Sequence, residues 1–154
     1  MDKKFAVFFD AENISSKNYE LAIREILIHG EILKKEVWGD CTSPLMKTWK
    51  DVLVKEPAAI HHQPQGQNAS DSRIIIEATK LMLCDPNIDA FCIVSTDVDF
   101  HVLAQELRVN GKYVLGIGKE EANPIWKESC NEFKTIERLK REETCKATNI
   151  RLVV

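Results

Sequence analysis

Two continuous apolar runs stand out in the pattern of hydrophobic and polar residues along the chain. One covers residues 5–9 and stops at Asp10, and the other covers residues 91–94 and stops at Ser95. Runs of this length without alternation are typical of strands that are buried on both faces of a sheet. Shorter apolar segments predict further strands at residues 32–38, 58–62, 112–117 and 133–136.

Segments with apolar residues at helical spacing alternate with these strands. Cap residues and the spacing predict helices that begin at Ser15 or Ser16, Ser43, Asn68, Phe100 and Asn123. Gly30, Pro57 and Gly111 are expected to end three of them. The residues of the first three helices that we expect to face the core are Tyr19, Ala22, Ile23, Ile26, Leu27, Leu45, Met46, Trp49, Val52, Leu53, Ile74, Ile75, Ala78, Leu81 and Met82.

The alternation of strands and amphipathic helices predicts an α/β fold. We expect a three-layer Rossmann-like sandwich with a mainly parallel central sheet and helices on both faces. Right-handed crossovers place the carboxyl ends of parallel strands at one edge of the sheet, which is where such sheets bind ligands. Functional residues are therefore expected directly after the strands.

The composition fits one soluble domain of ordinary size. The 154 residues are 44% apolar and 29% charged, and the formal net charge of −3 excludes a globally basic nucleic-acid binder but not a local basic face. Five cysteines without a Cys-x-x-Cys pair argue against a disulfide framework and a zinc site. No segment reaches the roughly 18 apolar residues of a transmembrane helix, and the start lacks a signal-peptide core, so we expect a cytoplasmic protein without membrane contact.

Four aspartates are expected to meet at the carboxyl edge of the sheet. Asp10 follows the first strand, Asp97 and Asp99 follow the fourth, and Asp71 lies in the first turn of the third helix on its inward-facing stripe. Like charges about 4 Å apart repel by roughly 4 kcal/mol at an effective dielectric constant of 20, so such a cluster either holds protons or binds a cation. Hard oxygen ligands without clustered His or Cys point to Mg²⁺ or Mn²⁺. Taken alone, Asp71 would be better explained by its favourable position at the positive end of the helix dipole.

Three short motifs follow one another in a recognisable order. Residues 8–13 read FFDAEN, residues 68–71 read NASD and residues 95–100 read STDVDF. Over about residues 5–138 they resemble the signature of NYN domains, particularly the LabA-like branch of the PIN-like nuclease superfamily. The resemblance implies a PIN-like fold and a metal-dependent ribonuclease that hydrolyses RNA phosphodiester bonds. It also implies catalytic, metal-binding roles for Asp10, Asp71, Asp97 and Asp99, and supporting roles for Asn13 and Ser95.

Three positions depart from the usual form of these motifs. Thr96 stands where glycine is usual, Gln67 where a lysine is often found, and Glu77, a supporting candidate, where an aspartate is common. Thr96 and Gln67 favour an alternative, a catalytically weak or inactive RNA-binding or regulatory module. A phosphohydrolase with Asp10 as nucleophile ranks last, because that class expects a second aspartate at the position of Glu12.

Substrate contacts and partners are less sharply indicated. Arg73 and Lys119 are candidates for contacts with substrate phosphates, although exposed basic residues are usually only solvated. We expect the domain to cover residues 1–138 and a charged tail with an apolar tip to cover residues 139–154. The tip suits docking on its own domain or on a second copy, so a homodimer or a protein partner that targets the domain to RNA are both open.

Overall fold

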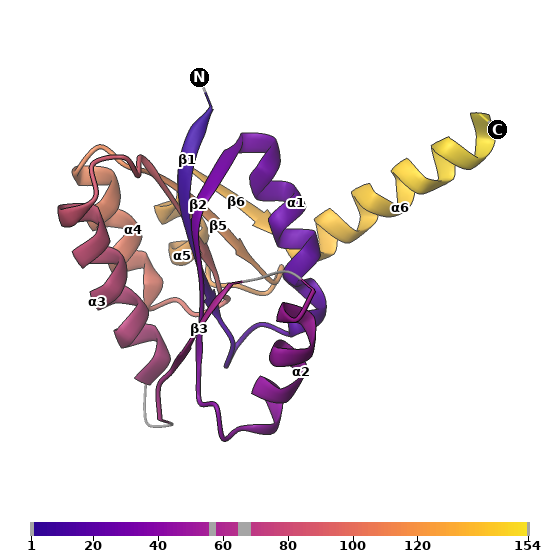
Figure 1. Ribbon diagram of the computed structural model, residues 1–154. Helices are drawn as coiled ribbons and strands as arrows, with labels where there is room; N and C mark the ends of the chain where they lie inside the picture. The colour runs from indigo at the N-terminus through magenta and orange to yellow at the C-terminus, as the bar shows by residue number, and fades with distance from the viewer. Residues whose placement is uncertain (1, 56–57, 65–68, 154) are drawn as a thin grey trace.

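A computed structural model describes residues 2–55, 58–64 and 69–153 (Figure 1). Gln67, Asn68 and Pro57, to which the sequence assigned a motif departure, a helix cap and a helix end, lie outside the described residues. The strands are β1 (Lys3–Asp10), β2 (Gly30–Gly39), β3 (Ala59–His62), β4 (Ala90–Val94), β5 (Tyr113–Gly118) and β6 (Glu132–Thr135). The helices are α1 (Tyr19–His29), α2 (Pro44–Leu53), α3 (Ala69–Cys84), α4 (Phe100–Val109), α5 (Pro124–Ser129) and α6 (Ile136–Val153).

The six strands form one sheet in the order β3-β2-β1-β4-β5-β6, and every neighbouring pair is parallel. The two apolar runs of the sequence, β1 and β4, are the central pair. Both are covered on two sides, which explains why their residues do not alternate with polar ones. The predicted α/β sandwich with a parallel sheet is confirmed.

Helices cover both faces of the sheet, as Figure 1 shows for α3 and α4 on one side and α1 and α2 on the other. Residues of β1 alternate between the two resulting cores. Phe5, Val7 and Phe9 pack with α1, α2 and the first turn of α6, whereas Ala6 and Phe8 pack with α3, α4 and α5. Asp10 continues the second set, so the strand period directs its side chain toward α3.

Three residues that the sequence predicts to begin or end helices do so in the structure. Ser43 caps α2 through its hydroxyl, which accepts from Leu45 N at 3.3 Å, and Pro44 follows at the first helical position. Asn123 caps α5 in the same way, since its Oδ1 accepts from Ile125 N at 2.9 Å. Gly111 adopts φ 77° just after α4, a left-handed conformation that favours glycine.

Some expectations about which helix residues face the core, and about where α1 and β2 begin, were wrong. Leu27 and Leu45 are exposed rather than inward-facing, because the buried stripe of each helix is narrower than its apolar pattern. Ser15 caps a short 3-10 turn, Ser16–Asn18, and α1 begins only after it. β2 begins at residue 30 rather than 32, since its first residues are partly exposed and leave no apolar run to detect.

The C-terminal segment is a continuous helix that projects from the domain (Figure 1). Its first turn buries Ile136 and Leu139 against the α1 side of the core, and the following residues through 149 are mostly exposed. The boundary between domain and tail after residue 138 stays a prediction. No helix within the described ranges is long and apolar enough to cross a membrane.

Candidate metal centre

The four predicted aspartates come from three segments that end or begin at the carboxyl edge of the sheet. Asp10 is the last residue of β1, Asp97 and Asp99 lie between β4 and α4, and Asp71 is the third residue of α3. One carboxylate oxygen from each of Asp71, Asp97 and Asp99 lies within 4.8 Å of those of the other two. The fold thus brings Asp71 together with two acids that lie 26 and 28 positions later in the sequence.

Asp10 is fully buried beside this group and is tightly held. Its Oδ2 accepts hydrogen bonds from Asn13 Nδ2 at 2.6 Å and from Ser95 Oγ at 2.8 Å. Its Oδ1 is also buried but has no hydrogen-bond partner among the residues that the structure describes. Burying a carboxylate oxygen without a hydrogen-bond donor costs free energy of folding, so we expect a partner for this atom, such as a cation.

Hydrogen bonds connect Asp10 with the acids that follow β4. The Ser95 hydroxyl, which donates to Asp10, accepts from Asp97 N at 3.1 Å. The carboxylate of Asp97 in turn accepts from Asp99 N at 2.9 Å. Because each bond fixes the next residue of the turn, the positions of these three acids depend on one another.

Burial and mutual repulsion perturb two of the carboxylates. Burial raises the pKa of Asp10 above its ordinary value, against the effect of the hydrogen bonds from Asn13 and Ser95, and the charge of Asp97 raises it further. Burial also raises the pKa of Asp71 from 3.8 to about 6, with added repulsion from the neighbouring aspartates, while the Ser72 N–H acts in the opposite direction. The fold therefore holds these acids in positions that are unfavourable for negative charge without a counter-charge.

Two further residues support the site and were missed by the sequence analysis. The indole Nε1 of Trp126 donates to the backbone oxygen of Ser95 at 2.9 Å. Gly118 passes so close to the same oxygen that a Cβ built on it would lie 2.5 Å away, which explains the glycine at the end of β5. Neither role could be detected locally, because the sequence around a tryptophan or a strand-end glycine does not show which distant backbone atom it contacts.

The structure places the remaining candidates around the acids rather than among them. Glu77 is paired with Arg73 at 3.1 Å and with Lys80 at 3.5 Å. The guanidinium of Arg73 also lies over the ring of Trp38, 5.6 Å from its centroid. Lys119 is exposed, and its backbone N donates to Thr96 Oγ1 at 3.2 Å.

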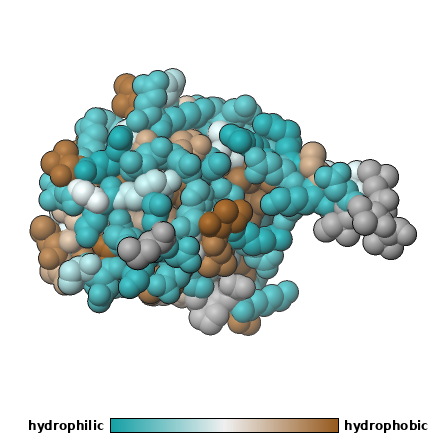
Figure 2. Space-filling view, turned by 90° about the horizontal axis from the view of Figure 1, so that it is seen from above, coloured by the Kyte–Doolittle hydropathy of each residue, from teal (hydrophilic) through white to brown (hydrophobic). Residues whose placement is uncertain are grey.

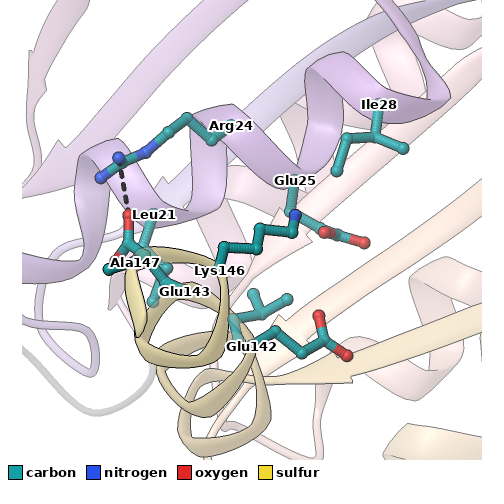
Figure 3. Close-up of a pocket in the computed structure, with 9 residues that line it drawn as sticks. Leu21, Arg24, Glu25, Ile28, Glu142, Glu143, Lys146 and Ala147 are labelled. Atoms are coloured by element: carbon teal, nitrogen blue, oxygen red, sulfur yellow. Dashed lines mark ion pairs between the residues drawn. The ribbon is translucent and has the colours of Figure 1, made fainter. Parts of the chain in front are cut away.

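A cavity of about 320 Å³ lies elsewhere, between α1 and α6. Figure 3 shows its lining, with the ion pair between Arg24 and Glu143 at 2.6 Å across one end. It shares no residue with the acid group. The acid group and this cavity are therefore separate features of the molecule.

The acid group fits a hard divalent cation. It offers carboxylate oxygens alone, the ligands that Mg²⁺ and Mn²⁺ prefer, and the partnerless Asp10 Oδ1 lies beside it. A bound cation would also supply a counter-charge against the burial and repulsion that raise the pKa values of Asp10 and Asp71.

Comparisons with known proteins agree with this reading of the fold. The crystal structure of a protein of unknown function from Vibrio parahaemolyticus is similar, with a TM-score of 0.71 and 16% identity over 88% of this chain and 93% of that one. No curated protein matches the sequence. The family model of the NYN domain matches residues 4–137. Since that match spans most of the sequence, this chain belongs to the NYN domain family.

Proposed function

We propose that the protein is a metal-dependent ribonuclease that hydrolyses phosphodiester bonds of RNA at its aspartate cluster. The NYN domain has a PIN-like nuclease fold, and the family suggests RNA as the substrate. The observation that carries the proposal is the meeting of Asp71, Asp97 and Asp99 at the carboxyl edge, beside the buried Asp10. The narrower LabA-like assignment and the cytoplasmic location stay predictions.

Asp71, Asp97 and Asp99 would hold the cation, Mg²⁺ or Mn²⁺, with Asp10 as a further ligand through its free oxygen. When bound, such a cation would lower the pKa of an attacking water molecule and stabilise negative charge on the phosphate oxygens. These carboxylates must be ionised to bind it, so binding competes with the protons that burial favours on Asp10 and Asp71.

The chain's own polar residues fix the geometry of the site. Asn13 and Ser95 occupy Oδ2 of Asp10 and leave Oδ1 as the atom available for a ligand. Ser95 also orients Asp97 through its backbone N–H. Because this serine of the third motif also contacts Asp10 of the first motif, the role of Ser95 is to fix the positions of Asp10 and Asp97 relative to each other.

Arg73 and Lys119 are proposed as contacts for the RNA backbone. Arg73 lies two residues after Asp71, and its stacking on Trp38 and pairing with Glu77 keep the guanidinium from moving freely. Glu77 thereby supports the site through Arg73 rather than as a direct ligand. Lys119 lies beside Thr96 in the neighbouring loop. A basic residue on either side of the acid group suits a strand of phosphates that passes over it.

The experiment is cleavage of short single-stranded and structured RNAs by the full chain with Mn²⁺, with Mg²⁺ and with chelator, alongside Asp97→Asn. We expect cleavage only with a divalent cation, and a loss of at least about 100-fold in the variant, the scale of removing a group that stabilises transition-state charge. Asp85→Asn is the matched control, because Asp85 lies at the opposite end of α3 and Asn keeps the acceptor oxygen for Asn87 N.

Three other results would each reject the proposal. Equal cleavage by Asp97→Asn would place the activity elsewhere. Salt-sensitive RNA binding without cleavage under any condition would favour the non-catalytic module instead. A phosphoryl group trapped on Asp10 would indicate a phosphohydrolase, although the full burial of this side chain counts against a nucleophilic role.

A further inference from the structure

Three residues on neighbouring strands form a row at the carboxyl edge of the sheet. Asp10 of β1 is in register with Trp38 of β2, and Trp38 is in register with His61 of β3. All three lie on the face of the sheet that α3 covers, where Trp38 belongs to the core. Because neighbouring strands lie about 4.8 Å apart, the Cα of His61 is roughly 10 Å from that of Asp10.

The two rings of this row are stacked on each other. The centroids of the Trp38 indole and the His61 imidazole are 4.3 Å apart, and the ring planes differ by 11°. Trp38 is 4% exposed, whereas the side chain of His61 is 35% exposed. The indole covers one face of the imidazole, and β3 is the outermost strand of the described sheet. The exposed face of the imidazole is therefore directed away from the sheet.

Glu36 contacts both rings of the stack. Its Oε2 accepts a hydrogen bond from Trp38 Nε1 at 3.1 Å. The buried Nε2 of His61 has no hydrogen-bond partner among the described residues, but it lies 3.4 Å from Glu36 Oε1. Lys34 Nζ is 3.7 Å from the same oxygen and balances the charge of this buried carboxylate. The imidazole is thus oriented before any ligand binds, so binding to it costs little ordering.

Arg73 connects the stack with the acid group. It lies two residues after Asp71 in α3, and its guanidinium is 5.6 Å from the centroid of the Trp38 ring. An exposed aromatic ring beside a cation is typical of surfaces that bind single-stranded nucleic acids, since the ring stacks on a base and the cation contacts a phosphate. Both groups lie next to the acids at the same edge of the sheet.

Exposed apolar side chains on the described part of the chain are scattered in the view from above. Figure 2 shows them as separate brown groups among teal, hydrophilic residues. Apolar residues scattered in this way are normal on a protein surface and need no ligand. The stack differs from them, because Trp38 and Glu36 hold the ring of His61 in one orientation beside the acids.

We propose that the exposed face of His61 stacks on an unpaired base next to the phosphate that the acid group attacks, so that the substrate is single-stranded RNA. This inference rests on the nuclease proposed above. Bases within a duplex are paired and stacked on their neighbours, whereas an unpaired base is free to stack on a ring of the protein. Because every base has a π-face, the platform selects for single strands and not for a sequence.

The test is RNA binding by the Asp97→Asn chain in chelator, where metal-dependent cleavage cannot occur. The anisotropy of an end label gives the affinities for a short single strand and for a duplex, and the single strand carries 2-aminopurine, whose fluorescence is quenched by stacking. We expect quenching on binding. His61→Ala should remove the quenching and weaken binding of the single strand at least about fivefold, with the affinity for the duplex unchanged.

Two further variants separate stacking from other roles. His61→Phe keeps a flat ring and removes both nitrogens, so it should preserve the quenching. His62→Ala is the matched control, because His62 is the next residue of β3 and 46% of its side chain is exposed, but strand alternation directs it to the other face. The ratio of single-strand to duplex affinity does not depend on the folded fraction, so it stays valid if His61→Ala loses stability.

Several outcomes would overturn the platform. They are unchanged binding and quenching in His61→Ala, an equal loss for single strand and duplex, an equal loss in His62→Ala, and a loss of quenching in His61→Phe. The nuclease is judged separately. Metal-dependent cleavage by the wild type together with binding that His61→Ala leaves unchanged would reject the platform alone, and stacking on His61 without any cleavage would reject the nuclease alone.

Discussion

The α1 side of the sheet and the carboxyl edge of the sheet differ in how their acids are paired. On the α1 side, Glu25 Oε1 lies 3.2 Å from His29 Nε2 and 3.9 Å from Lys134 Nζ. At the carboxyl edge, Asp71, Asp97 and Asp99 lie together, and among the described residues none of the three forms an ion pair with a basic side chain.

This difference separates a structural arrangement from a functional one. Pairing with His29 and Lys134 offsets the cost of burying Glu25, as stability alone requires. The acids of the carboxyl edge increase one another's cost, and burial has raised the pKa of two of them. A fold keeps such an arrangement when a ligand of opposite charge completes it.

The largest effect that we predict is stabilisation by a bound divalent cation. At pH 7.5, Mn²⁺ at 100 times its dissociation constant should stabilise the folded chain by about 2.7 kcal/mol, or roughly 5–10 °C in Tm. Asp97→Asn should abolish this shift, whereas Glu25→Gln on the α1 side of the sheet should keep it. Differential scanning calorimetry with Mn²⁺ and with chelator measures the shift, and an equal shift in wild type and Asp97→Asn would contradict the assigned site.

The next prediction concerns the sign of two neutralising substitutions in chelator at pH 7. Asp71→Asn should stabilise the fold by on the order of 1–2 kcal/mol, because it removes a buried charge that its neighbours repel. Glu25→Gln should destabilise it by about 1 kcal/mol, because it breaks largely buried pairs with His29 and Lys134. Urea unfolding measures both, and two changes of the same sign would remove the contrast between the paired Glu25 and the acids of the carboxyl edge.

The pH dependence of the Asp71 effect follows from its raised pKa. A carboxyl with a pKa of 3.8 in the unfolded chain and about 6 in the folded one favours folding while it is protonated. Its contribution is complete below about pH 4 and is lost as the pH rises to about 6. The advantage of Asp71→Asn over wild type should therefore disappear near pH 4, and a constant advantage from pH 4 to 7 would show that charge is not its cause.

The fold and the acids were predictable because their signals are local. The apolar runs that end at Asp10 and Ser95 identified the central strands, and the parallel topology then required their carboxyl ends to meet. The helical period directed Asp71 inward, where it is buried. Each inference needed only a short stretch of sequence and a general rule of chain geometry.

The support of the site was not predictable in this way, since it depends on contacts between distant segments. Trp126 and Ser95 are 31 positions apart, and nothing near the tryptophan distinguishes an indole that donates to a site from one that fills a core. Glu77 illustrates the converse. Its place in the motif suggested a role among the acids, but its side chain pairs with Arg73 and Lys80.

Replacing Trp126 tests whether the carboxyl edge needs this distant support. Trp126→Phe keeps an aromatic ring but removes the donor to Ser95 O, and we expect about 1 kcal/mol of destabilisation together with a severalfold higher Mn²⁺ midpoint for RNA cleavage. Trp49→Phe is the matched control on the other face, where Trp49 packs on Phe9 and Tyr19. It should lose similar stability with no change in the Mn²⁺ midpoint.

The smallest predicted effect lies at Thr96, the residue between Ser95 and Asp97. Its hydroxyl accepts from Lys119 N at 3.2 Å, so this residue links the loops after β4 and β5. Thr96→Val keeps the shape and loses the acceptor, and we expect about 0.5 kcal/mol of destabilisation, because the exposed Lys119 N–H can bond to water instead. Thr96→Ser keeps the acceptor and should match wild type in urea unfolding. If Thr96→Val cost as much as Trp126→Phe, the loop contact would support the carboxyl edge as strongly as the buried indole does, and our ranking of the two would be wrong.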